Sequence, residues 1–373
     1  MILAGDIGGT KTILALFDWT TERVEPVRQQ TFYSADYKAF EDILDEFLNP
    51  PPPPPLLPED EGPGKETTGE GESSADSSEG PQAEEPPVPE KIVIDAACFG
   101  IAGPVIDNRV RTTNLPWVID GAELATRFEI PTVKLLNDLE AMAYSILVLR
   151  PEEYDVLNAG SPPKEPRAIA LIAAGTGLGE AMLCWDGQRY TPMASEGGHT
   201  DFAPNSDEEI NLLRYLRTQY LHVSYERVVS GAGLVHIYEY LRDAKKNEPT
   251  WLAEKMKAGD PAAAIAEAGL SGQTEIAKQA LNLFATIYGA EAGNLALKTL
   301  SLNGVYLGGG IAPKLLGKLK EGLFMRAFIN KGRYKKLMSQ IPVRVILNPH
   351  AGLLGAASMA ANLACPPTPA TPS

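Results

Sequence analysis

The stretch from residue 2 to residue 18 constrains the fold of this chain more than any other. Two short apolar runs, Ile2–Ala4 and Ile13–Phe17, flank a polar turn that contains Asp6, Gly8 and Gly9. Apolar runs this close together, with glycines between them, predict a β-hairpin. Because glycine lacks a Cβ atom, the backbone N–H groups of such a turn can approach a bulky anion closely. The pattern therefore predicts a hairpin whose turn contacts phosphate.

Side chains in the same turn add two hydroxyl donors, a positive charge and a carboxylate. Thr10 and Thr12 supply the hydroxyls, Lys11 supplies the charge, and Asp6 ends the first strand. A carboxylate at that place can orient a hydrated Mg²⁺ ion through water. The spacing G-x-x-x-x-G-K-[ST] of a P-loop does not occur. We predict a phosphate-and-metal turn, with an ordinary glycine turn of a hairpin as the alternative.

The chain carries a formal net charge of −15, which disfavours nucleic acid as a partner. A surface that binds a phosphate backbone needs clustered Lys and Arg. Residues 59–90 hold eleven acidic residues and one lysine, a net of −10, which leaves −5 for the rest of the chain. Much of the negative charge is therefore local, and the folded part is expected to be only mildly acidic.

Three cysteines, Cys98, Cys184 and Cys365, lie far apart in the 373-residue chain and form no C-x-x-C pair. Such usage fits a reducing compartment better than a disulfide framework. No basic segment precedes Ile2, which argues against a signal peptide. No apolar run approaches the roughly 18 residues that a membrane span needs. We therefore expect a cytoplasmic protein without a membrane partner.

The composition changes sharply between Asn49 and Glu90. Six consecutive prolines, Pro50–Pro55, open this segment, and Glu, Ser, Gly and Pro make up most of the rest. Polyproline favours an extended left-handed helix, and the remaining residues carry too few apolar side chains to order themselves. We predict a disordered insertion within one domain, with a proline-rich ligand for a partner as the alternative. The tail 366–373 is also predicted to be disordered.

The rest of the first half reads as alternating strands and helices. Predicted strands are Val27–Tyr33, Lys91–Gly100 and Val133–Asn137, and predicted helices are Tyr37–Leu48, Gly121–Phe128 and Leu139–Leu149. A polar stretch with Gly160, Pro162, Pro163 and Pro166 is interpreted as the crossing point between two domains.

The second half repeats the strand, glycine turn, strand order of the amino terminus. Ala168–Ala174 is predicted to be a buried strand, Gly175, Thr176 and Gly177 begin a turn, and Glu180–Trp185 is the next strand. The two halves are therefore expected to be duplicates that face each other across a cleft. Mostly helices are predicted beyond this repeat, over Asp207–Tyr220, Gly231–Lys245, Pro261–Gly269, Thr274–Leu300 and Leu353–Leu363. Two further strands are predicted, over Gly304–Leu307 and Val343–Leu347.

Six separated segments, in this order, resemble bacterial glucokinase. They are Asp6-Ile-Gly-Gly-Thr-Lys-Thr12, Leu136-Asn-Asp138, Ala174-Gly-Thr-Gly-Leu-Gly179, Ser195-Glu-Gly-Gly-His199-Thr-Asp-Phe-Ala-Pro204, Glu226-Arg-Val-Val-Ser-Gly-Ala-Gly233 and Val305-Tyr-Leu-Gly-Gly-Gly-Ile311. The resemblance covers nearly the whole chain except residues 49–90 and the tail. A related group of sugar kinases carries a zinc-binding cysteine cluster shortly after the Glu-Gly-Gly-His loop, and this sequence has none. The chain therefore resembles the zinc-free glucokinase branch of the actin-like sugar kinases.

The resemblance implies an α/β fold of the actin-like ATPase, ribonuclease-H-like type, with two α/β domains around a cleft. The smaller domain would comprise 1–148 plus 352–365, and the larger, helix-rich domain would comprise 149–351. The implied activity is ATP-dependent phosphorylation of D-glucose to glucose 6-phosphate, with Mg²⁺ bound. A homodimer is expected from the resemblance alone.

The resemblance also implies a set of site residues. Asp138 would be the catalytic base that takes the proton of the sugar 6-hydroxyl, whereas from the residues alone it could instead cap the helix that follows. The sugar-binding residues would be Asn114, Asn137, Asp138, Glu196, His199 and Glu226. The nucleotide-binding residues would be Asp6, Gly8, Gly9, Thr10, Lys11, Thr12, Gly175, Thr176, Gly177, Gly308, Gly309 and Gly310, with Asp6 near the Mg²⁺.

Three other functions share parts of this pattern. A kinase for fructose, mannose or N-acetylmannosamine would have the same machinery and a different sugar pocket. A sugar-sensing transcription regulator would place a helix-turn-helix before the kinase fold, and here the predicted fold begins at residue 2. An actin-like filament protein would keep the nucleotide turns without needing the Glu-Gly-Gly-His loop.

Overall fold

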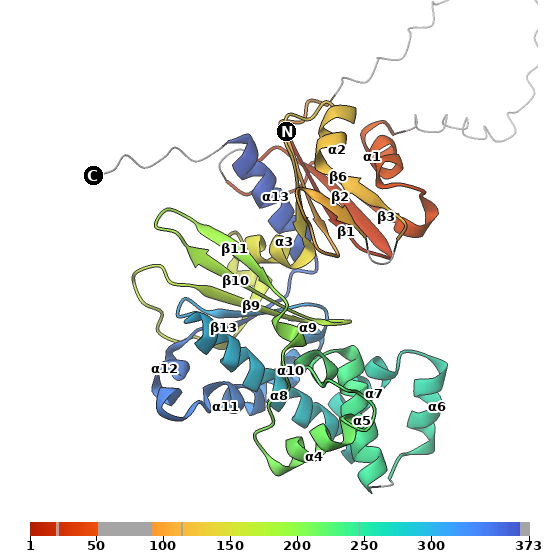
Figure 1. Cartoon of the computed structure of the whole chain (residues 1–373), viewed down its shortest axis with the longest axis vertical. Coiled ribbons are helices and arrows are strands. Elements are labelled where there is room, and N and C mark those ends of the chain that lie inside the picture. Colours follow the sequence, from red (N-terminus) through yellow and green to blue (C-terminus); the bar gives the residue numbers. More distant parts are fainter. Residues whose placement is uncertain (20–21, 51–91, 113–114, 246, 366–373) are drawn as a thin grey trace, which may run out of the picture.

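The computed structural model describes residues 1–19, 22–50, 92–112, 115–245 and 247–365. The described residues form two large β-sheets, one above the other in Figure 1, with helices packed on them. Three predictions lie outside the described residues: nearly all of the disordered insertion, the disordered tail, and the sugar-binding residue Asn114.

The first sheet has the strand order β3-β2-β1-β4-β7. Its strands are β1 (Ile2–Ile7), β2 (Lys11–Phe17), β3 (Arg28–Tyr33), β4 (Ala96–Ile101) and β7 (Val133–Asn137). Strand β2 is antiparallel to both β1 and β3, whereas β4 is parallel to β1 and to β7. The predicted amino-terminal hairpin is therefore confirmed, and the N–H of Gly8 donates to the carbonyl of Lys11 across its turn (2.9 Å).

The second sheet has the strand order β11-β10-β9-β12-β13-β8. Its strands are β8 (Tyr154–Asn158), β9 (Ile169–Ala174), β10 (Leu178–Trp185), β11 (Tyr190–Ser195), β12 (Val305–Gly308) and β13 (Val343–Ile346). Strands β9, β10 and β11 form an antiparallel meander, and β12 and β13 follow in parallel. This is the pattern of the first sheet with β8 added at one edge, so the predicted duplication is present in the strand order. A separate hairpin pairs β5 (Arg109–Arg111) with β6 (Val118–Asp120).

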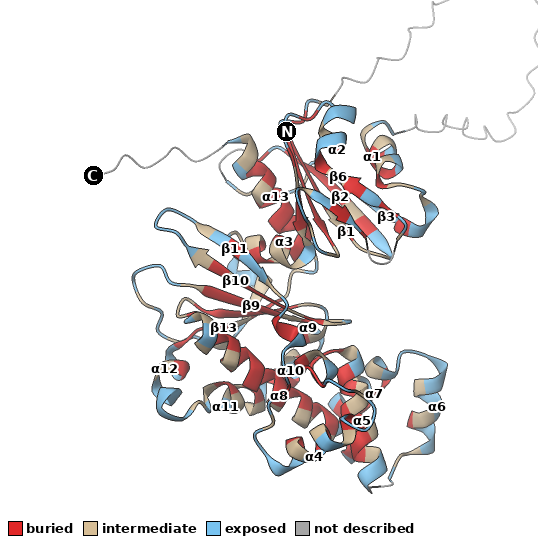
Figure 2. Ribbon diagram, in the orientation of Figure 1, coloured by how far each residue is buried: buried red, intermediate tan, exposed pale blue. Residues whose placement is uncertain are grey.

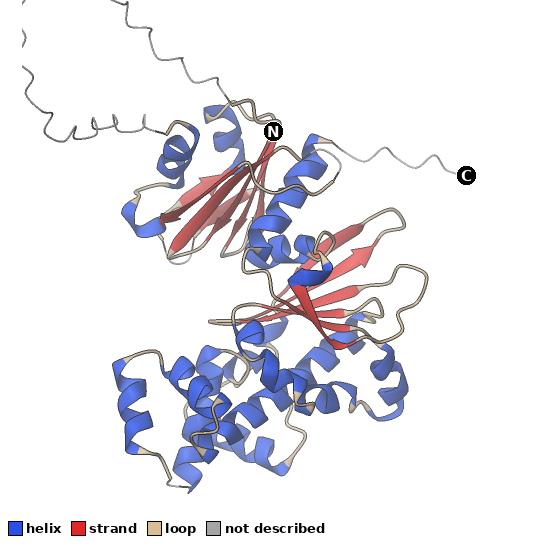
Figure 3. Ribbon diagram, turned by 180° about the vertical axis from the view of Figure 1, so that it is seen from behind, coloured by secondary structure: helices blue, strands red, loops and turns tan. Residues whose placement is uncertain are grey.

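Thirteen α-helices lie in the described part of the chain. They are α1 (Phe40–Leu48), α2 (Gly121–Arg127), α3 (Asp138–Ser145), α4 (Asp207–Leu216), α5 (Gly231–Lys245), α6 (Thr250–Ala258), α7 (Pro261–Leu270), α8 (Glu275–Thr299), α9 (Ile311–Lys314), α10 (Leu316–Lys320), α11 (Leu323–Ile329), α12 (Lys335–Gln340) and α13 (Ala351–Ala364). Most helices of the second half pack on the side of the second sheet that faces away from the first sheet, as Figure 3 also shows.

Successive side chains of a strand point to opposite faces of the sheet, so alternate residues pack against different helices. Leu3 and Ile7 of β1 lie in the core that also contains residues of α1 and α2, whereas Ile2 and Ala4 lie in the core with α13. In the second sheet, alternate residues of β9 face either the α8 core or a smaller cluster with α3. Helix α8 is largely buried, as Figure 2 shows.

Helix α3 lies between the two sheets and is joined there by α13. Ala141 of α3 belongs to the first-sheet core with α13, and Ala143 belongs to the cluster with β9 and β10. The two helices cross in close contact, because a Cβ atom at Gly355 of α13 would overlap the carbonyl oxygen of Ala141. The relation of the two sheets therefore depends on this helix pair.

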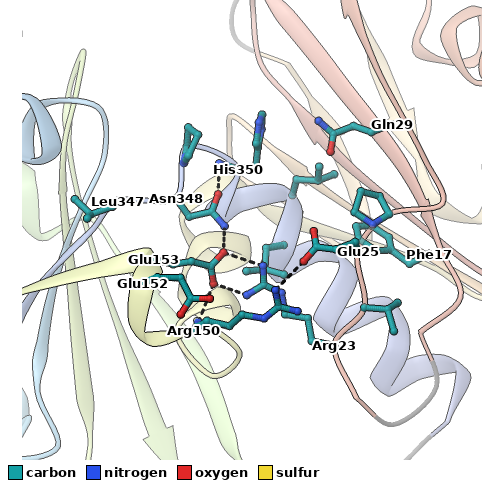
Figure 4. Close-up of a pocket in the computed structure, with 15 residues that line it drawn as sticks. Phe17, Arg23, Glu25, Gln29, Arg150, Glu152, Glu153, Leu347, Asn348 and His350 are labelled. Carbon is teal, nitrogen blue, oxygen red and sulfur yellow. Dashed lines mark hydrogen bonds and ion pairs between the residues drawn. The ribbon is translucent and has the colours of Figure 1, made fainter.

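The chain crosses from the first sheet to the second earlier than the polar stretch predicted. A short 3-10 helix, Pro151–Glu153, leads directly into β8. Strand β13, after which the chain returns to the first sheet, ends beside this 3-10 helix. The backbone N–H of Leu347 donates to the carbonyl of Glu153 (2.7 Å), and Asn348 Nδ2 donates to the Glu153 carboxylate (2.7 Å). The Glu153 carboxylate also pairs with Arg23 of the β2–β3 loop, at a cavity of about 480 Å³ (Figure 4).

Several element predictions were wrong in extent or incomplete. The predicted strand from Lys91 is β4, which begins at Ala96, and the predicted helix to Leu149 ends at Ser145. Strands β6, β8 and β11 and helices α6 and α9 to α12 were not predicted. Of these strands, β8 and β11 lie at edges of the second sheet, where they pair on one side only.

Candidate active site

Asp138 is the first residue of α3, directly after the end of β7. The helix is capped by its neighbour, because the Asn137 carboxamide oxygen accepts from the N–H of Leu139 (2.9 Å). Asp138 Oδ1 accepts from the same N–H (2.9 Å). The alternative in which Asp138 is the helix cap is therefore wrong, and its carboxylate is available to a ligand.

Asp6 lies close enough to Asp138 for the charge of Asp138 to raise the pKa of Asp6. Burial, followed by the charge of Asp138, raises the pKa of Asp6 to about 6. Burial is also the main cause that raises the pKa of Asp138 above its ordinary value, with a smaller contribution from Glu196. Asp6 lies near the carboxyl end of β1 and Asp138 directly follows β7; β1, β4 and β7 are parallel, so these carboxyl ends lie at the same end of the sheet.

A cavity of about 450 Å³, here called the acidic cavity, contains both aspartates. It is lined by Asp6, Asp138, Leu139, Met142, Ala173, Gly175, Thr176, Gly177, Leu178, Gly179, Glu196, His199, Glu226, Gly309 and Gly352. Four carboxylates and one histidine, from four separate segments of the chain, therefore meet in one place. The sequence predicted all five of these titratable residues as site residues.

Glu226 is fixed against the turn that follows β9. Its Oε2 atom accepts from the N–H of Leu178 (3.0 Å), and a Cβ atom at Gly177 would lie 2.5 Å from the same oxygen. A glycine at 177 therefore allows this close approach. The other carboxylate oxygen, Oε1, lies 4.0 Å from His199 Nδ1.

The backbone of the loop with Glu196 and His199 is held by packing and a hydrogen bond, whereas these two side chains are exposed to solvent. Gly198 packs against the carbonyl of Leu178 with no room for a side chain, and Thr200 Oγ1 donates to the carbonyl of Gly197 (2.7 Å). The side chains of Glu196 and His199 are 89% and 59% exposed, against 30% for Glu226. The first two carry polar groups that a ligand can still bury.

A second cavity of about 610 Å³, here called the apolar cavity, shares Gly175 and Thr176 with the first. Its lining is Gly175, Thr176, Gly231, Ala232, Leu234, Val235, Asp260, Pro261, Ala262, Ala263, Ala266, Gly310, Ile311, Lys314 and Leu315. The amino terminus of the 15-residue helix α5 opens into it, and the N–H of Gly231 donates to the carbonyl of Gly175 (2.9 Å). A helix amino terminus beside a glycine turn favours phosphate.

The three glycines at the end of β12, Gly308 to Gly310, have different surroundings. Gly308 is buried, and a Cβ atom there would lie 2.6 Å from the sulfur of Met142, so this glycine makes room for α3. Gly309 has a φ of +77° and lines the acidic cavity. Gly310 lines the apolar cavity, with open space at its Cβ position.

Some predicted site residues lie outside the linings of both cavities in the described part of the chain. These residues are Gly8, Gly9, Thr10, Lys11, Thr12, Asn137 and Gly308. Thr12 is buried, with its hydroxyl 3.0 Å from that of Ser34, and Lys11 Nζ lies 5.8 Å from the ring centroid of Tyr33. Asn137 Nδ2 donates to the carbonyl of Gly103 (3.0 Å) while its oxygen caps α3.

Sequence reasoning missed several residues of both cavities. Gly352 lies where a Cβ atom would be 3.0 Å from Asp6 Oδ2, so α13 begins against the carboxylate. Asp260 caps α7 by accepting from the N–H of Ala262 (2.9 Å), beside the apolar cavity. The Asp260-Pro261 pair is a helix-start signal that the sequence already held, whereas Gly352 carries no local signal.

Asp6 has the chemistry of a magnesium ligand. No donor among the described residues is hydrogen-bonded to its carboxylate, and burial disfavours its charged form. A hard cation prefers such a carboxylate oxygen. The residues present therefore fit a Mg²⁺ ion held by Asp6, directly or through water.

The described helices include none that is long and apolar enough to cross a membrane. A family model for glucokinase matches residues 3–363. The glucokinase of Nostoc punctiforme is 40% identical over 97% of this chain and 99% of its own length. That of Synechocystis is 43% identical over 96% of this chain and 97% of its own.

Solved structures agree with the fold. A glucokinase from an Antarctic psychrotroph superposes with a TM-score of 0.77 at 29% identity, covering 97% of this chain and 98% of its own. A ROK-family glucokinase from Streptomyces griseus, solved with glucose and AMPPNP, shows the same fold with a TM-score of 0.55 at 19% identity, over 96% of this chain and 98% of its own. The fold is thus the two-domain, actin-like fold that the sequence predicted. On the family match and the cyanobacterial relatives together, the chain belongs to the glucokinase family.

Proposed function

We propose that this chain transfers the γ-phosphoryl group of ATP to the 6-hydroxyl of D-glucose. The observation that carries the proposal is that Asp138, the turn 175–177 and the Glu196–His199–Glu226 group line one cavity. A phosphoryl acceptor, a base and a phosphate turn must meet within such a space for in-line transfer. The domain division at residues 148 and 352 remains part of the proposal.

Asp138 is the proposed general base. Burial raises its pKa, which makes the carboxylate a stronger base than an exposed aspartate. The N–H of Leu139 holds one carboxylate oxygen in place (2.9 Å). The second oxygen is then directed to the sugar hydroxyl, whose proton it removes as the phosphoryl group arrives.

Glu196, His199 and Glu226 are the proposed partners of the remaining sugar hydroxyls. Glu226 keeps one oxygen on the Leu178 N–H and offers the other, while His199 donates or accepts according to its tautomer. A pocket that pairs each hydroxyl rejects sugars whose hydroxyls are absent or inverted. Asn114 and Asn137 remain proposed sugar contacts; Asn137 would have to release or share the bonds it now makes.

The nucleotide is proposed to lie along the apolar cavity, with its phosphates at the shared turn. Thr176 and the first turn of α5 supply backbone donors there, and Gly310 leaves space for the adenosine. The hairpin residues Gly8 to Thr12 would reach the phosphates only if the first sheet moved toward the second. Asp6 would hold Mg²⁺, which when bound neutralises charge on the transferring phosphates.

The oligomeric state and the cellular location are also part of the proposal. A homodimer is proposed from the resemblance. A cytoplasmic location is proposed from the three cysteines, each a free thiol in the structure.

A coupled assay of ADP release over a panel of hexoses tests the function. With Mg-ATP we expect D-glucose to have a kcat/KM at least about tenfold above fructose, mannose and N-acetylmannosamine. Excess EDTA should abolish turnover. A higher kcat/KM for another hexose would select the alternative kinase, and ADP release independent of any sugar would contradict both.

A further inference from the structure

A third cavity, of about 440 Å³, lies away from the two already described and shares no residue with them. It is formed where the start of α4, the middle of α8 and the segment from α11 to α12 meet. Its lining is Asn205, Ser206, Glu209, Thr286, Ala290, Leu323, Arg326, Ala327, Ile329, Asn330, Lys331 and Lys335. Three cations and one carboxylate therefore face the same space, here called the basic cavity.

The positive charge of this region is unusual for the chain. Residues 314–336 contain eight Lys and Arg and one acidic residue, in a protein of net charge −15. Arg326 and Lys335 form no ion pair or hydrogen bond with any described residue. The carboxylate, Glu209, already accepts from the N–H of Asn205 (2.6 Å). The cavity thus has more positive charge than its own residues neutralise.

The ammonium group of Lys331, one of these cations, is partly buried. Its Nζ donates to the carbonyl of Ala290 (2.8 Å) and to Asn294 Oδ1 (2.6 Å). It reaches them past Gly293, where a Cβ atom would lie 2.7 Å from Lys331 Cε. An ammonium has three donors, so one N–H remains for a ligand in the cavity. Burial lowers the pKa of this lysine, and a bound anion would offset that effect.

A chain of hydrogen bonds leads from Lys331 to the sugar side of the acidic cavity. Asn294 Nδ2 donates to the hydroxyl of Tyr225 (3.0 Å) and to the carboxylate of Glu291 (2.8 Å). Tyr225 is the residue before Glu226, in the same short 3-10 helix. A shift of the Lys331 ammonium is therefore two side chains away from a proposed sugar ligand.

We propose that the basic cavity is a binding site for a phosphate-bearing anion, connected to the sugar site through Lys331, Asn294 and Tyr225. Arg326 supplies a guanidinium that matches two phosphate oxygens, and Lys331 and Lys335 supply ammonium groups to the same cavity. The volume admits inorganic phosphate or a small phosphomonoester such as a sugar phosphate. Both sources share the dianionic phosphoryl group, and the experiment separates them.

The binding test is a calorimetric titration with inorganic phosphate and, in a second arm, with a sugar phosphate. A saturating non-hydrolysable ATP analogue fills the nucleotide cavity during both titrations. We expect the double variant R326Q/K335Q to weaken binding about tenfold or more. The matched control R333Q/K336Q removes the same charge from exposed positions of the same segment that do not line the cavity, and should change affinity by less than about twofold. A tighter affinity for one arm identifies the source.

Two results would overturn the site. Equal losses in both double variants would show a diffuse basic surface, and undiminished binding in R326Q/K335Q would place the anion elsewhere. Glucose phosphorylation by R326Q/K335Q without added anion should equal that of the wild type, since neither residue lines the proposed active site.

The connection to the sugar site rests on the proposed function and has its own test. Linkage is reciprocal, so the phosphate affinity should change at least about threefold when glucose is added, and Asn294→Leu should remove that change. An affinity that glucose leaves unaltered, in enzyme that phosphorylates glucose normally, would overturn the connection.

Discussion

At the scale of single residues, the account depends most on Asp138. We expect Asp138→Asn to lower kcat for glucose about 10²- to 10⁴-fold, because the amide cannot accept the hydroxyl proton. The melting temperature and the affinity for ATP should stay near those of the wild type. Glu123→Gln, an exposed acid in the first turn of α2, is the matched control and should keep full activity. A kcat near the wild-type value in Asp138→Asn would contradict the assignment.

Asp6 leads to a prediction in which stability and activity change in opposite directions. Its pKa is raised from 3.8 to about 6, so the folded protein binds more protons than the unfolded chain between these pH values. The free energy of unfolding therefore falls as the pH rises from about 4 to about 6. Asp6→Asn removes this effect and should stabilise the protein by about 1–2 kcal/mol at pH 7, while abolishing Mg²⁺-dependent turnover. Denaturant unfolding at pH 7 and pH 4 measures the first effect, and a variant less stable than the wild type at pH 7 would contradict it.

Individual residues show which parts of the site could be predicted from the sequence. The five titratable residues of the acidic cavity were all predicted, because each lies in a motif of the resemblance with a distinct chemical type. Thr12 and Gly308 lie in equally good motifs, yet Thr12 bonds to Ser34 and Gly308 makes room for Met142. Which way a side chain points at the end of a strand depends on the register of its neighbours, and a single sequence does not contain that information.

At the scale of elements, the crossing of α3 and α13 is the joint between the two sheets. A side chain at Gly355 would overlap the carbonyl of Ala141, so we expect Gly355→Ala to destabilise the protein by about 1–3 kcal/mol. Gly317 in α10 is the matched control, since nothing beyond its chain neighbours and its own helix backbone lies within 4 Å of its Cβ position. Gly317→Ala should be neutral or stabilising by up to about 1 kcal/mol. Thermal unfolding compares the two, and equal melting temperatures would show that the helices separate at no cost.

The buried central strands and the long helices were all predicted. Strands β1, β9 and β12 are almost wholly buried apolar runs, and helices α5 and α8 span 15 and 25 residues. Strand β11 contains a proline and is half exposed, and β8 alternates weakly at the sheet edge. Helices α9 to α12 are four to seven residues long, too short for a helical period to register.

At the scale of the whole molecule, Glu153 ties the segment that enters the second sheet to Asn348, on the segment that leaves it. It also ties that segment to Arg23 in the β2–β3 loop of the first sheet (Figure 4). Its hydrogen bonds with Arg23 are the main cause that lowers its pKa from 4.5 to about 2. Stability from this depressed pKa is present above about pH 4.5 and is lost as the pH falls toward 2.

We therefore expect Glu153→Gln to destabilise the protein by about 1–2 kcal/mol at pH 6, with the difference from the wild type shrinking as the pH falls from 4.5 toward 2. The matched control is Glu165→Gln, whose side chain is 80% exposed and pairs only with Arg167 among the described residues; it should change stability by less than about 0.5 kcal/mol. Denaturant unfolding over this pH range is the measurement. A difference that persists undiminished at low pH would mean that the charge of Glu153 is not its source.

The central claim is that one glucose molecule joins ligands from the two sheets. Asp138 follows a strand of the first sheet, whereas Glu226 and the exposed Glu196 and His199 belong to the second half of the chain. A small sugar contacts both groups only if they approach, which would also exclude water from the transferring phosphoryl group. Closure should require Glu226, so Glu226→Gln should need more glucose for the same change.

Small-angle X-ray scattering of the whole chain, with and without saturating glucose, tests this claim most directly. We expect the radius of gyration to fall when glucose binds, and Glu226→Gln to show the same fall only at a higher glucose concentration. A radius of gyration unchanged at a glucose concentration that saturates turnover would contradict it.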